Sequence, residues 1–193
     1  MKSDTPQTKS AVSFRLQRIF DEGHLIPTKY QGYFQEMGVL YGKWECLWCK
    51  YVWWALSPAE CRDCGSLLLR YAEVGLTNLD WLISGHADGW IKSIGPDALI
   101  EIKSVGTGTV RIEAPTLFAE HDGNLEGIWK DLSRPFYTHV KQGQLYLRVL
   151  NATRDDAPQS IVFLYESKLS QDAKEFHVPY NTSITDPIIE NCL

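Results

Sequence analysis

The sequence predicts an α/β fold, a central mixed sheet flanked by helices, and three patterns of apolar residues support this fold class. Apolar side chains recur at helical spacing over residues 12–37, and the period shifts towards that of strands over residues 79–104. A further helix is expected over residues 135–150, followed by a strand over 160–166. Helical and strand periods that succeed one another in one chain are typical of a sheet with helices packed on its faces.

The first part of the chain is expected to hold a bent helix and then a cysteine-rich block. Gly23 and Pro27 lie between two helical runs and predict a break or bend. Residues 41–73 contain four of the five cysteines and four of the seven tryptophans. We therefore expect one domain over residues 1–193, with residues 41–73 as an inserted, zinc-ribbon-like subdomain.

The later elements are predicted from strand periods and turn residues. A turn-like segment, 92–97, separates two strands, and Pro135 fits the first turn of a helix. Gly123 and Gly127 lie within a segment that is otherwise helical in pattern, and the tail from residue 181 carries no prediction. We expect strands over residues 81–91, 98–105, 160–166 and 175–178, and a helix over residues 115–132.

Composition and charge exclude several classes of protein. With 193 residues, 44% of them hydrophobic and 22% charged, the chain has the balance of a globular domain rather than of a disordered protein. A net charge of −5 argues against a protein that coats nucleic acid through bulk positive charge. Residues 1–10 are polar and form no signal peptide, and the apolar stretch 47–56 is too short to span a bilayer. We therefore expect a cytoplasmic protein with no membrane partner.

Four cysteines predict a structural zinc site. They form two Cys-x-x-Cys knuckles separated by eleven residues: Cys46, Cys49, Cys61 and Cys64. Four thiolates close a tetrahedron around zinc and leave no open position for a substrate. Two disulfides, unrelated buried cysteines and an iron–sulfur cluster are the alternatives, and the paired symmetric knuckles favour zinc.

The tryptophans around these cysteines have two interpretations. They stack on exposed nucleic-acid bases, or they fill the space between the zinc module and the main core. We favour the packing role for this group, which consists of Trp44, Trp48, Trp53 and Trp54.

Two polar strands predict a carboxylate pair. If residues 81–91 and 98–105 form a hairpin that is symmetric about the turn, Asp88 lies opposite Glu101 and His86 lies opposite Lys103. Side chains alternate between the two faces of a strand, so these four residues would share one face. The other face would carry Ile100, Ile102 and the small residues of the first strand towards the core.

A carboxylate directly opposite another carboxylate needs a compensating charge, because like charges in this position destabilise a strand pair. A divalent cation such as magnesium or manganese would supply that charge, since both prefer oxygen ligands. Two other readings fit the same pattern: a register shifted by one residue, or neutralisation of the pair by Lys103 in an exposed sheet.

With these residues in view, the sequence resembles the PD-(D/E)XK nuclease superfamily, in particular the RecB-like branch of phage exonucleases and CRISPR-adaptation nucleases. Three motifs match in order within residues 80–150: Gly85-x-x-Asp88, Glu101-Ile102-Lys103, and Gln142 with Tyr146 four residues later. The resemblance implies a restriction-endonuclease-like core. The CRISPR-adaptation relatives hold an iron–sulfur cluster through cysteines split between the chain ends, whereas here all four lie together, so the cluster is not carried over.

The resemblance also implies roles for individual residues. Asp88, Glu101 and the carbonyl of Ile102 would hold catalytic magnesium or manganese, and Lys103 would orient the attacking water or stabilise negative charge. A plain salt bridge to Glu101 is the alternative role for Lys103. His24 matches a metal-binding histidine of the first helical region; an alignment shifted by three residues would place Pro27 there instead.

A helical face is expected to contact the substrate. Gln142 and Tyr146 are one turn apart, and His139 lies three residues before Gln142 on the same face. His86 is a further candidate for contact with phosphate. Packing of Tyr146 in the core, and an exposed His86 without a role, are the alternatives at these two positions.

The function expected from the resemblance is hydrolysis of DNA phosphodiester bonds, with exonuclease action in phage DNA replication or recombination as the preferred subtype. The expected partners are single- or double-stranded DNA and phage or host replication and recombination proteins, in the cytoplasm of an infected bacterium. The alternative function is a non-catalytic zinc-ribbon scaffold, binding nucleic acid or protein, on a decayed nuclease core.

Overall fold

The computed structural model describes the backbone of residues 14–190 and the side chains of residues 25–190. The elements along the chain are α1 (Phe14–Glu36), β1 (Leu40–Cys46), β2 (Val52–Leu56), β3 (Leu69–Tyr71), β4 (Val74–Asn78), β5 (Ile83–Ala87), β6 (Gly89–Ile91), β7 (Ala98–Val105), α2 (Thr107–Glu113), α3 (Pro115–Glu120), α4 (Leu125–Asp131), α5 (Tyr137–Thr153), β8 (Ser160–Ser167), β9 (Ala173–Pro179) and α6 (Thr182–Glu190). No helix within this part of the chain is long and apolar enough to cross a membrane.

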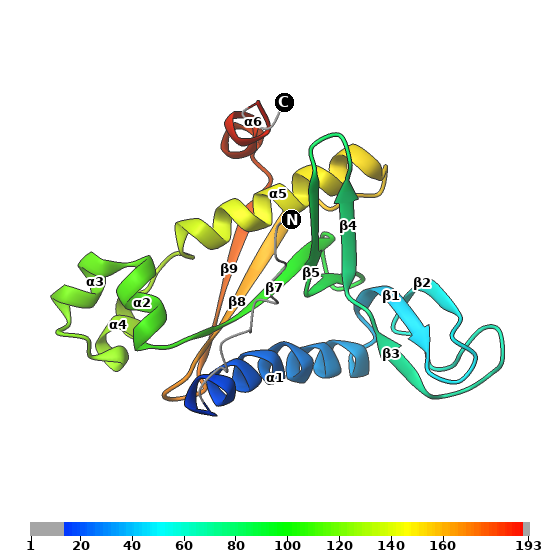
Figure 1. Ribbon diagram of the computed structural model, residues 1–193, viewed down its shortest axis with the longest axis horizontal. Coiled ribbons are helices and arrows are strands. Elements are labelled where there is room, and N and C mark those ends of the chain that lie inside the picture. The colour runs from blue at the N-terminus through cyan, green and yellow to red at the C-terminus, as the bar shows by residue number, and fades with distance from the viewer. Residues whose placement is uncertain (1–13, 191–193) are drawn as a thin grey trace, which may run out of the picture.

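A central mixed sheet flanked by helices forms the body of the molecule, which confirms the predicted fold class at this level (Figure 1). The strand order is β2-β1-β6-β7-β8-β9, and β3 also pairs with β1. β7 and β8 run parallel, whereas the other pairs in the sheet are antiparallel. β4 and β5 form a separate two-stranded ribbon that projects beside α5.

Helices cover the two faces of β7 and β8. On one face, α1 packs Ile26 against a cluster that includes Ile100 and Ile102. On the other face, α5 contributes Leu147 to a larger cluster that includes Leu99. Even-numbered residues of β7 therefore face α1 and odd-numbered residues face α5, as strand alternation requires. Figure 1 shows the two helices on opposite sides of these strands.

The predicted break in the first helix is wrong. α1 runs without interruption through Gly23 and Pro27. Ile26, Tyr30 and Phe34 follow one another at one-turn intervals and pack on the sheet. This tertiary packing maintains the helix across the one backbone hydrogen bond that a proline is unable to donate.

The predicted strand over residues 81–91 is two strands in two different sheets. β5 pairs with β4, and β6 pairs with β7, so the chain changes sheets at Asp88. His86 consequently lies opposite Gly75 and not opposite Lys103. The change has a packing cause, because the ribbon buries Val74 and Ala87 in the same core cluster as the α5 face of β7.

Two helical predictions also need correction, and one helix was not predicted. The single helix expected over 115–132 is two helices, α3 and α4, because Gly123 adopts a left-handed φ of +74° between them. Asn124 then caps α4, its side chain accepting hydrogen bonds from the next turn. Pro135 precedes the N-cap of α5, Phe136, and does not lie in its first turn. α6 occupies the tail that carried no prediction.

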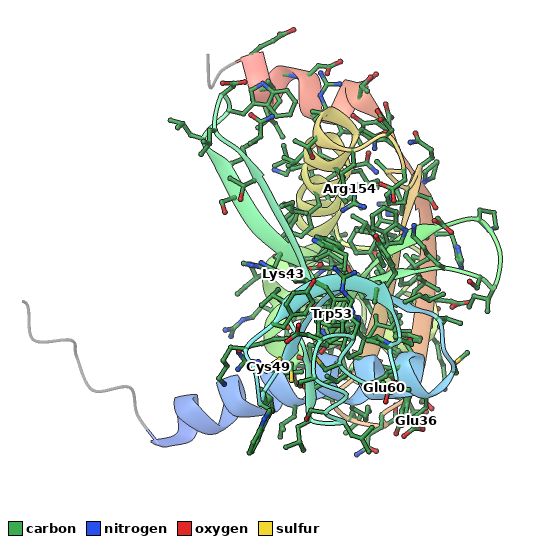
Figure 2. The ribbon with its side chains drawn as sticks, turned by 90° about the vertical axis from the view of Figure 1, so that its right-hand side faces the viewer. Glu36, Lys43, Cys49, Trp53, Glu60 and Arg154 are labelled. Carbon is green, nitrogen blue, oxygen red and sulfur yellow. The ribbon has the colours of Figure 1, made fainter. Side chains whose placement is uncertain are left out.

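The cysteine-rich block joins the main sheet directly. β1, β2 and β3 are the strands of this block, and β1 pairs with β6 through Leu40 and Tyr41. In Figure 2, Cys49 and Trp53 lie in this block above α1, and Arg154 lies beyond it at the end of α5.

Candidate functional site

The four cysteine sulfur atoms come together at one end of the sheet. The Sγ atoms of Cys46 and Cys64 are 3.7 Å apart, and those of Cys49 and Cys61 are 3.6 Å apart. All four atoms lie within 4.8 Å of one another. Four thiolates about 2.3 Å from a central zinc ion would be separated by ~3.8 Å, whereas bonded disulfide sulfurs are ~2.05 Å apart. These cysteines are free thiols at a spacing that can hold one metal ion such as zinc.

The two knuckles have the same backbone structure. The residue after each knuckle has a left-handed φ, 65° at Lys50 and 71° at Gly65, and donates its N–H to the first cysteine of its own knuckle. The N–H groups of those first cysteines, Cys46 and Cys61, each donate to the carbonyl five residues later. This repeated geometry places two thiolates on the same side of each turn and accounts for the convergence of all four.

The tryptophans of this block divide between two roles. Trp44 and Trp53 are buried around the cysteines, and Trp54 packs against the main core, as the packing interpretation predicts. Trp48 differs, because it lies between the two cysteines of the first knuckle and is 75% exposed.

The second candidate site centres on Asp88, at the point where the chain passes from β5 to β6. The pairing of Gly89 with Ile100 continues to Asp88 opposite Glu101, so the predicted register is correct for this pair. Asp88 Oδ2 accepts a hydrogen bond of 2.6 Å from the N–H of Ile102. Because the N–H and C=O of one strand residue point towards the same neighbour, the Ile102 carbonyl also lies on the Asp88 side of β7.

Glu101 and Lys103 form an ion pair on the α5 face of β7. Lys103 Nζ donates to Glu101 Oε1 over 2.6 Å, and Glu101 is only 3% exposed. The second carboxylate oxygen, Glu101 Oε2, is buried and has no hydrogen-bond partner within the described part of the chain. A buried carboxylate oxygen without a partner is costly, so the site is one in which a cation would be favourable.

Burial raises the pKa values of both carboxyl groups, and the charge of a neighbouring carboxylate adds to it at each, Glu101 at Asp88 and Glu73 at Glu101. Burial is the largest cause at Asp88, the charge of Glu101 is the next, and together they raise its pKa to about 7. Burial likewise raises the pKa of Glu101, although Lys103 opposes this effect. For Lys103, burial lowers the pKa, but the charge and hydrogen bond of Glu101 outweigh it, so the pKa ends above its ordinary value. Lys103 is therefore a cation at neutral pH.

α5 brings the predicted polar face to this pair. Gln142 Nε2 donates to Tyr146 Oη over 2.6 Å. Burial is the largest cause of a raised pKa at Tyr146, and the charges of Glu101 and Asp88 add to it, so the phenol lies within their electrostatic reach. Two glycines make the approach possible: a Cβ on Gly143 would meet Ile161 at 2.7 Å, and one on Gly85 would meet Tyr146 at 3.0 Å. The glycine of the Gly85-x-x-Asp88 motif thus makes room for Tyr146.

His139 lies on the same side of the sheet but is held by a different partner. Its Nδ1 is 2.5 Å from the hydroxyl of Tyr165, which also accepts the N–H of Phe136. Burial, followed by the positive charge of Lys103, lowers the pKa of His139 to about 4. The imidazole is therefore neutral at physiological pH.

Two predicted site residues stand apart from this group. His86 is exposed on β5, and its backbone pairs with β4 rather than with β7. The side chain of His24 lies outside the described residues.

Sequence reasoning did not single out two residues that the structure brings to Asp88. Gln31, on α1, donates from Nε2 to the Asp88 carbonyl over 2.8 Å. Glu73 precedes β4 and its charge raises the pKa of both Asp88 and Glu101. Neither belongs to a short motif, because both reach Asp88 through tertiary structure.

Comparisons with known proteins add little to this geometry. No protein-family model matches the chain, and no curated protein sequence matches it. Among solved structures, the chain is similar to the "Crystal structure of SSO0001", with 13% identity and a TM-score of 0.42. The likeness covers 91% of this chain and 59% of that chain, so this chain spans about three fifths of that protein's length. A likeness of this strength carries no functional argument, and the chemistry of the site has to carry it.

Proposed function

We propose that the protein is a metal-dependent DNA nuclease whose active site is the group formed by Asp88, Glu101 and Lys103. The observation that carries the proposal is the buried carboxylate of Glu101, which lies opposite Asp88 and has one oxygen without a partner among residues 25–190. Stability alone would favour an apolar pair at these positions, because buried like charges are costly. A retained acidic pair beside a lysine is the arrangement that cation-assisted phosphodiester hydrolysis requires.

The residues present fit a magnesium or manganese ion. Two carboxylates and the Ile102 carbonyl offer the oxygen donors that both ions prefer. A bound ion would supply positive charge to the scissile phosphate and lower the pKa of an attacking water. Gln31 fixes the Asp88 backbone through its carbonyl, and the Ile102 N–H fixes the Asp88 side chain.

Lys103 would act through its charge. Its pKa lies above the ordinary value, so it is not a general base at neutral pH. Its ammonium group can instead orient a water molecule and stabilise negative charge on the phosphate oxygens as the P–O bond breaks. Gln142 and Tyr146 lie on the same side of the sheet and offer an amide and a hydroxyl for hydrogen bonds to substrate.

The order of the motifs supports a site of the PD-(D/E)XK kind on a restriction-endonuclease-like core. The acidic residue, the Glu-x-Lys strand and the helix with Gln142 and Tyr146 follow in the order that the RecB-like resemblance implies. Exonuclease action on DNA ends, in phage replication or recombination, is the subtype that this resemblance favours.

The four cysteines would bind zinc as a structural ion. Their spacing fits a single ion with four protein ligands, whereas an iron–sulfur cluster would attach the thiolates to separate iron atoms at wider spacing. Zinc would thus hold β1–β3 together without taking part in hydrolysis.

Cleavage of end-labelled linear and closed-circular DNA tests the proposal. We expect zinc-loaded protein to cut linear DNA in manganese or magnesium, and Lys103→Gln to reduce the rate by at least ~100-fold. Lys29→Gln is the matched control, because Lys29 pairs with the buried carboxylate of Glu166 on the opposite face of the same sheet and its loss changes the net charge by the same amount. The cleavage rate of this control should stay close to that of the wild type.

The outcomes separate three functions. Cleavage of linear DNA alone supports an exonuclease, and cleavage of circles as well keeps the site but makes the protein an endonuclease. Folded, zinc-loaded protein that binds DNA without cutting it would replace the proposal with a non-catalytic scaffold.

A further inference from the structure

Glu73 occupies the position next to Asp88 on the ribbon side of the site. Val74 pairs with Ala87 in the antiparallel β4–β5 ribbon, and the next step of this ladder brings Glu73 opposite Asp88. Asp88 is therefore flanked by a carboxylate from each sheet, Glu101 from β7 and Glu73 from the start of β4. The placement depends on the register of the ribbon and on no sequence motif.

The backbone of Glu73 is held in an unfavourable conformation. Its φ is 59°, in the left-handed region that residues other than glycine and asparagine rarely adopt. β1 fixes this turn in both directions, because Lys43 N–H donates to the Glu73 carbonyl over 3.1 Å and the Ala72 N–H donates to the Lys43 carbonyl over 2.7 Å. These two hydrogen bonds hold Glu73 in a conformation that a glycine would adopt without strain.

The carboxylate of Glu73 lacks a compensating cation. It forms no ion pair within the part of the chain that the structure describes, and Arg70, its neighbour in the turn, pairs with Glu45. Three carboxylates thus face a single ammonium group, that of Lys103. Glu73 therefore adds a further uncompensated negative charge to the one that Asp88, Glu101 and Lys103 leave.

A shallow cavity of about 330 Å³, open to solvent, is lined by Arg70, Tyr71, Ala72, Glu73 and His86, so it borders the acidic group through Glu73. Its size accommodates several water molecules. Glu101 Oε2, which is buried and has no partner among the described residues, is a sign independent of Glu73 that a positive ligand belongs at the acidic group.

We propose that Glu73 is the third carboxylate of the cation site and binds the hydrated divalent cation from the cavity side. Among the described residues, the four cysteines are the one set of three or more His, Cys, Asp or Glu side chains whose ligand atoms all lie within 4.8 Å of one another. The carboxylates of Glu73, Asp88 and Glu101 are therefore too far apart for all three to bind one ion directly. Glu73 would contact the cation through one of its water molecules. Magnesium in particular retains several of its waters when protein carboxylates bind it. The inference rests on the proposed function, because it assumes a cation at Asp88 and Glu101.

Calorimetric titration of the zinc-loaded full chain with manganese, without DNA, tests this role. We expect Glu73→Gln to weaken manganese binding by roughly 10-fold, because mutation of residues in the outer shell of a metal site lowers metal affinity by about this factor. Asp80→Asn is the matched control, because Asp80 is an exposed acid at the tip of the same ribbon and its loss changes the net charge by the same amount. Glu101→Gln should remove the binding altogether.

Thermal unfolding without manganese distinguishes the proposed role from a structural one. Loss of an uncompensated charge should leave Glu73→Gln as stable as the wild type or more stable, while a structural residue would lower the unfolding temperature. Equal manganese affinity in Glu73→Gln and the wild type, or equal weakening in Asp80→Asn, would overturn the inference and leave the nuclease proposal standing. A wild type that binds no manganese outside the cysteine site would overturn both.

Discussion

Asp88 is the residue at which the two sheets, the Ile102 N–H and the acidic pair meet. Its pKa of about 7 exceeds the ordinary 3.8 because burial and Glu101 both disfavour the charged form. When folding raises the pKa of a carboxyl group, the folded state binds the proton more tightly than the unfolded state. The group's contribution to stability is then complete below the unfolded pKa and is lost as the pH rises through the folded pKa. The metal-free protein should therefore lose stability from this group between about pH 4 and pH 7.

The variant Asp88→Asn tests this electrostatic cost. At pH 8 and without divalent ions, we expect the variant to be more stable than the wild type by roughly 1–2 kcal/mol, because the amide keeps an acceptor for Ile102 but carries no charge. At pH 4 the advantage should vanish, since Asp88 is then protonated. Denaturant unfolding at the two pH values measures the difference, and an advantage that is equal at both would contradict the assigned pKa.

At this scale the sequence allowed part of the site to be predicted. Asp88 and Glu101 could be paired because the turn between their strands is short and their register follows from its symmetry. His86 was misplaced because a strand that looks continuous in sequence changes sheets at Asp88. Glu73 and Gln31 act through contacts that only the folded chain creates.

The two knuckles are the element that depends most on a bound ion. Lys50 and Gly65 occupy equivalent left-handed positions, so a side chain is tolerated at one and absent at the other. We expect Lys50→Gly to preserve or raise stability and Gly65→Ala to lower it by about 1 kcal/mol, from backbone strain alone, since a Cβ there meets no atom within 4 Å. Thermal unfolding of the zinc-loaded variants checks both, and a destabilised Lys50→Gly would show that its side chain has another role.

The contact of α5 with the sheet is the element that sets the position of Gln142 and Tyr146. A Cβ on Gly143 would lie 2.7 Å from both Ile161 Cδ1 and Phe163 Cζ. We expect Gly143→Ala to lower the free energy of unfolding by roughly 1–2 kcal/mol, because overpacking outweighs the gain in helix propensity.

Gly108→Ala in α2 is the control for Gly143→Ala. A Cβ at Gly108 meets nothing within 4 Å, so this change should be neutral or mildly stabilising. Denaturant unfolding compares the two variants. A Gly143→Ala protein as stable as the control would contradict the close packing of α5.

Helices and strands with a regular spacing of apolar residues could be predicted well from the sequence. Their ends and interruptions could not. The strand over 98–105 was placed correctly because its apolar run is flanked by turn residues. The helical pattern over residues 12–37 was expected to break or bend at Gly23 and Pro27, and the break was wrong because the sheet contact that keeps the helix continuous is not visible in the sequence. The ends of α3 and α4 depended on one left-handed glycine.

At the scale of the whole molecule, a protein of net charge −5 is proposed to act on a polyanion. Bulk charge opposes that encounter, so binding has to rely on a local site in which a cation offsets the carboxylates. The mixed sheet places the acidic group and the α5 face on the same side, while the cysteine block lies at one end of the sheet (Figure 1). This arrangement would keep the proposed catalytic cation apart from a metal ion held by the cysteines.

The rate of DNA cleavage in manganese by zinc-loaded wild type and by Glu101→Gln is the most direct test of the central claim. Among the side chains that the structure describes, Glu101 is the one buried carboxylate with an unpartnered oxygen, and the isosteric amide removes its negative charge. We expect cleavage by the wild type to depend on manganese and the variant to be at least ~100-fold slower, with unchanged zinc content and unfolding temperature close to that of the wild type. Equal cleavage rates for the two proteins, or no cleavage by either, would contradict the claim that Asp88 and Glu101 form a metal-dependent nuclease site.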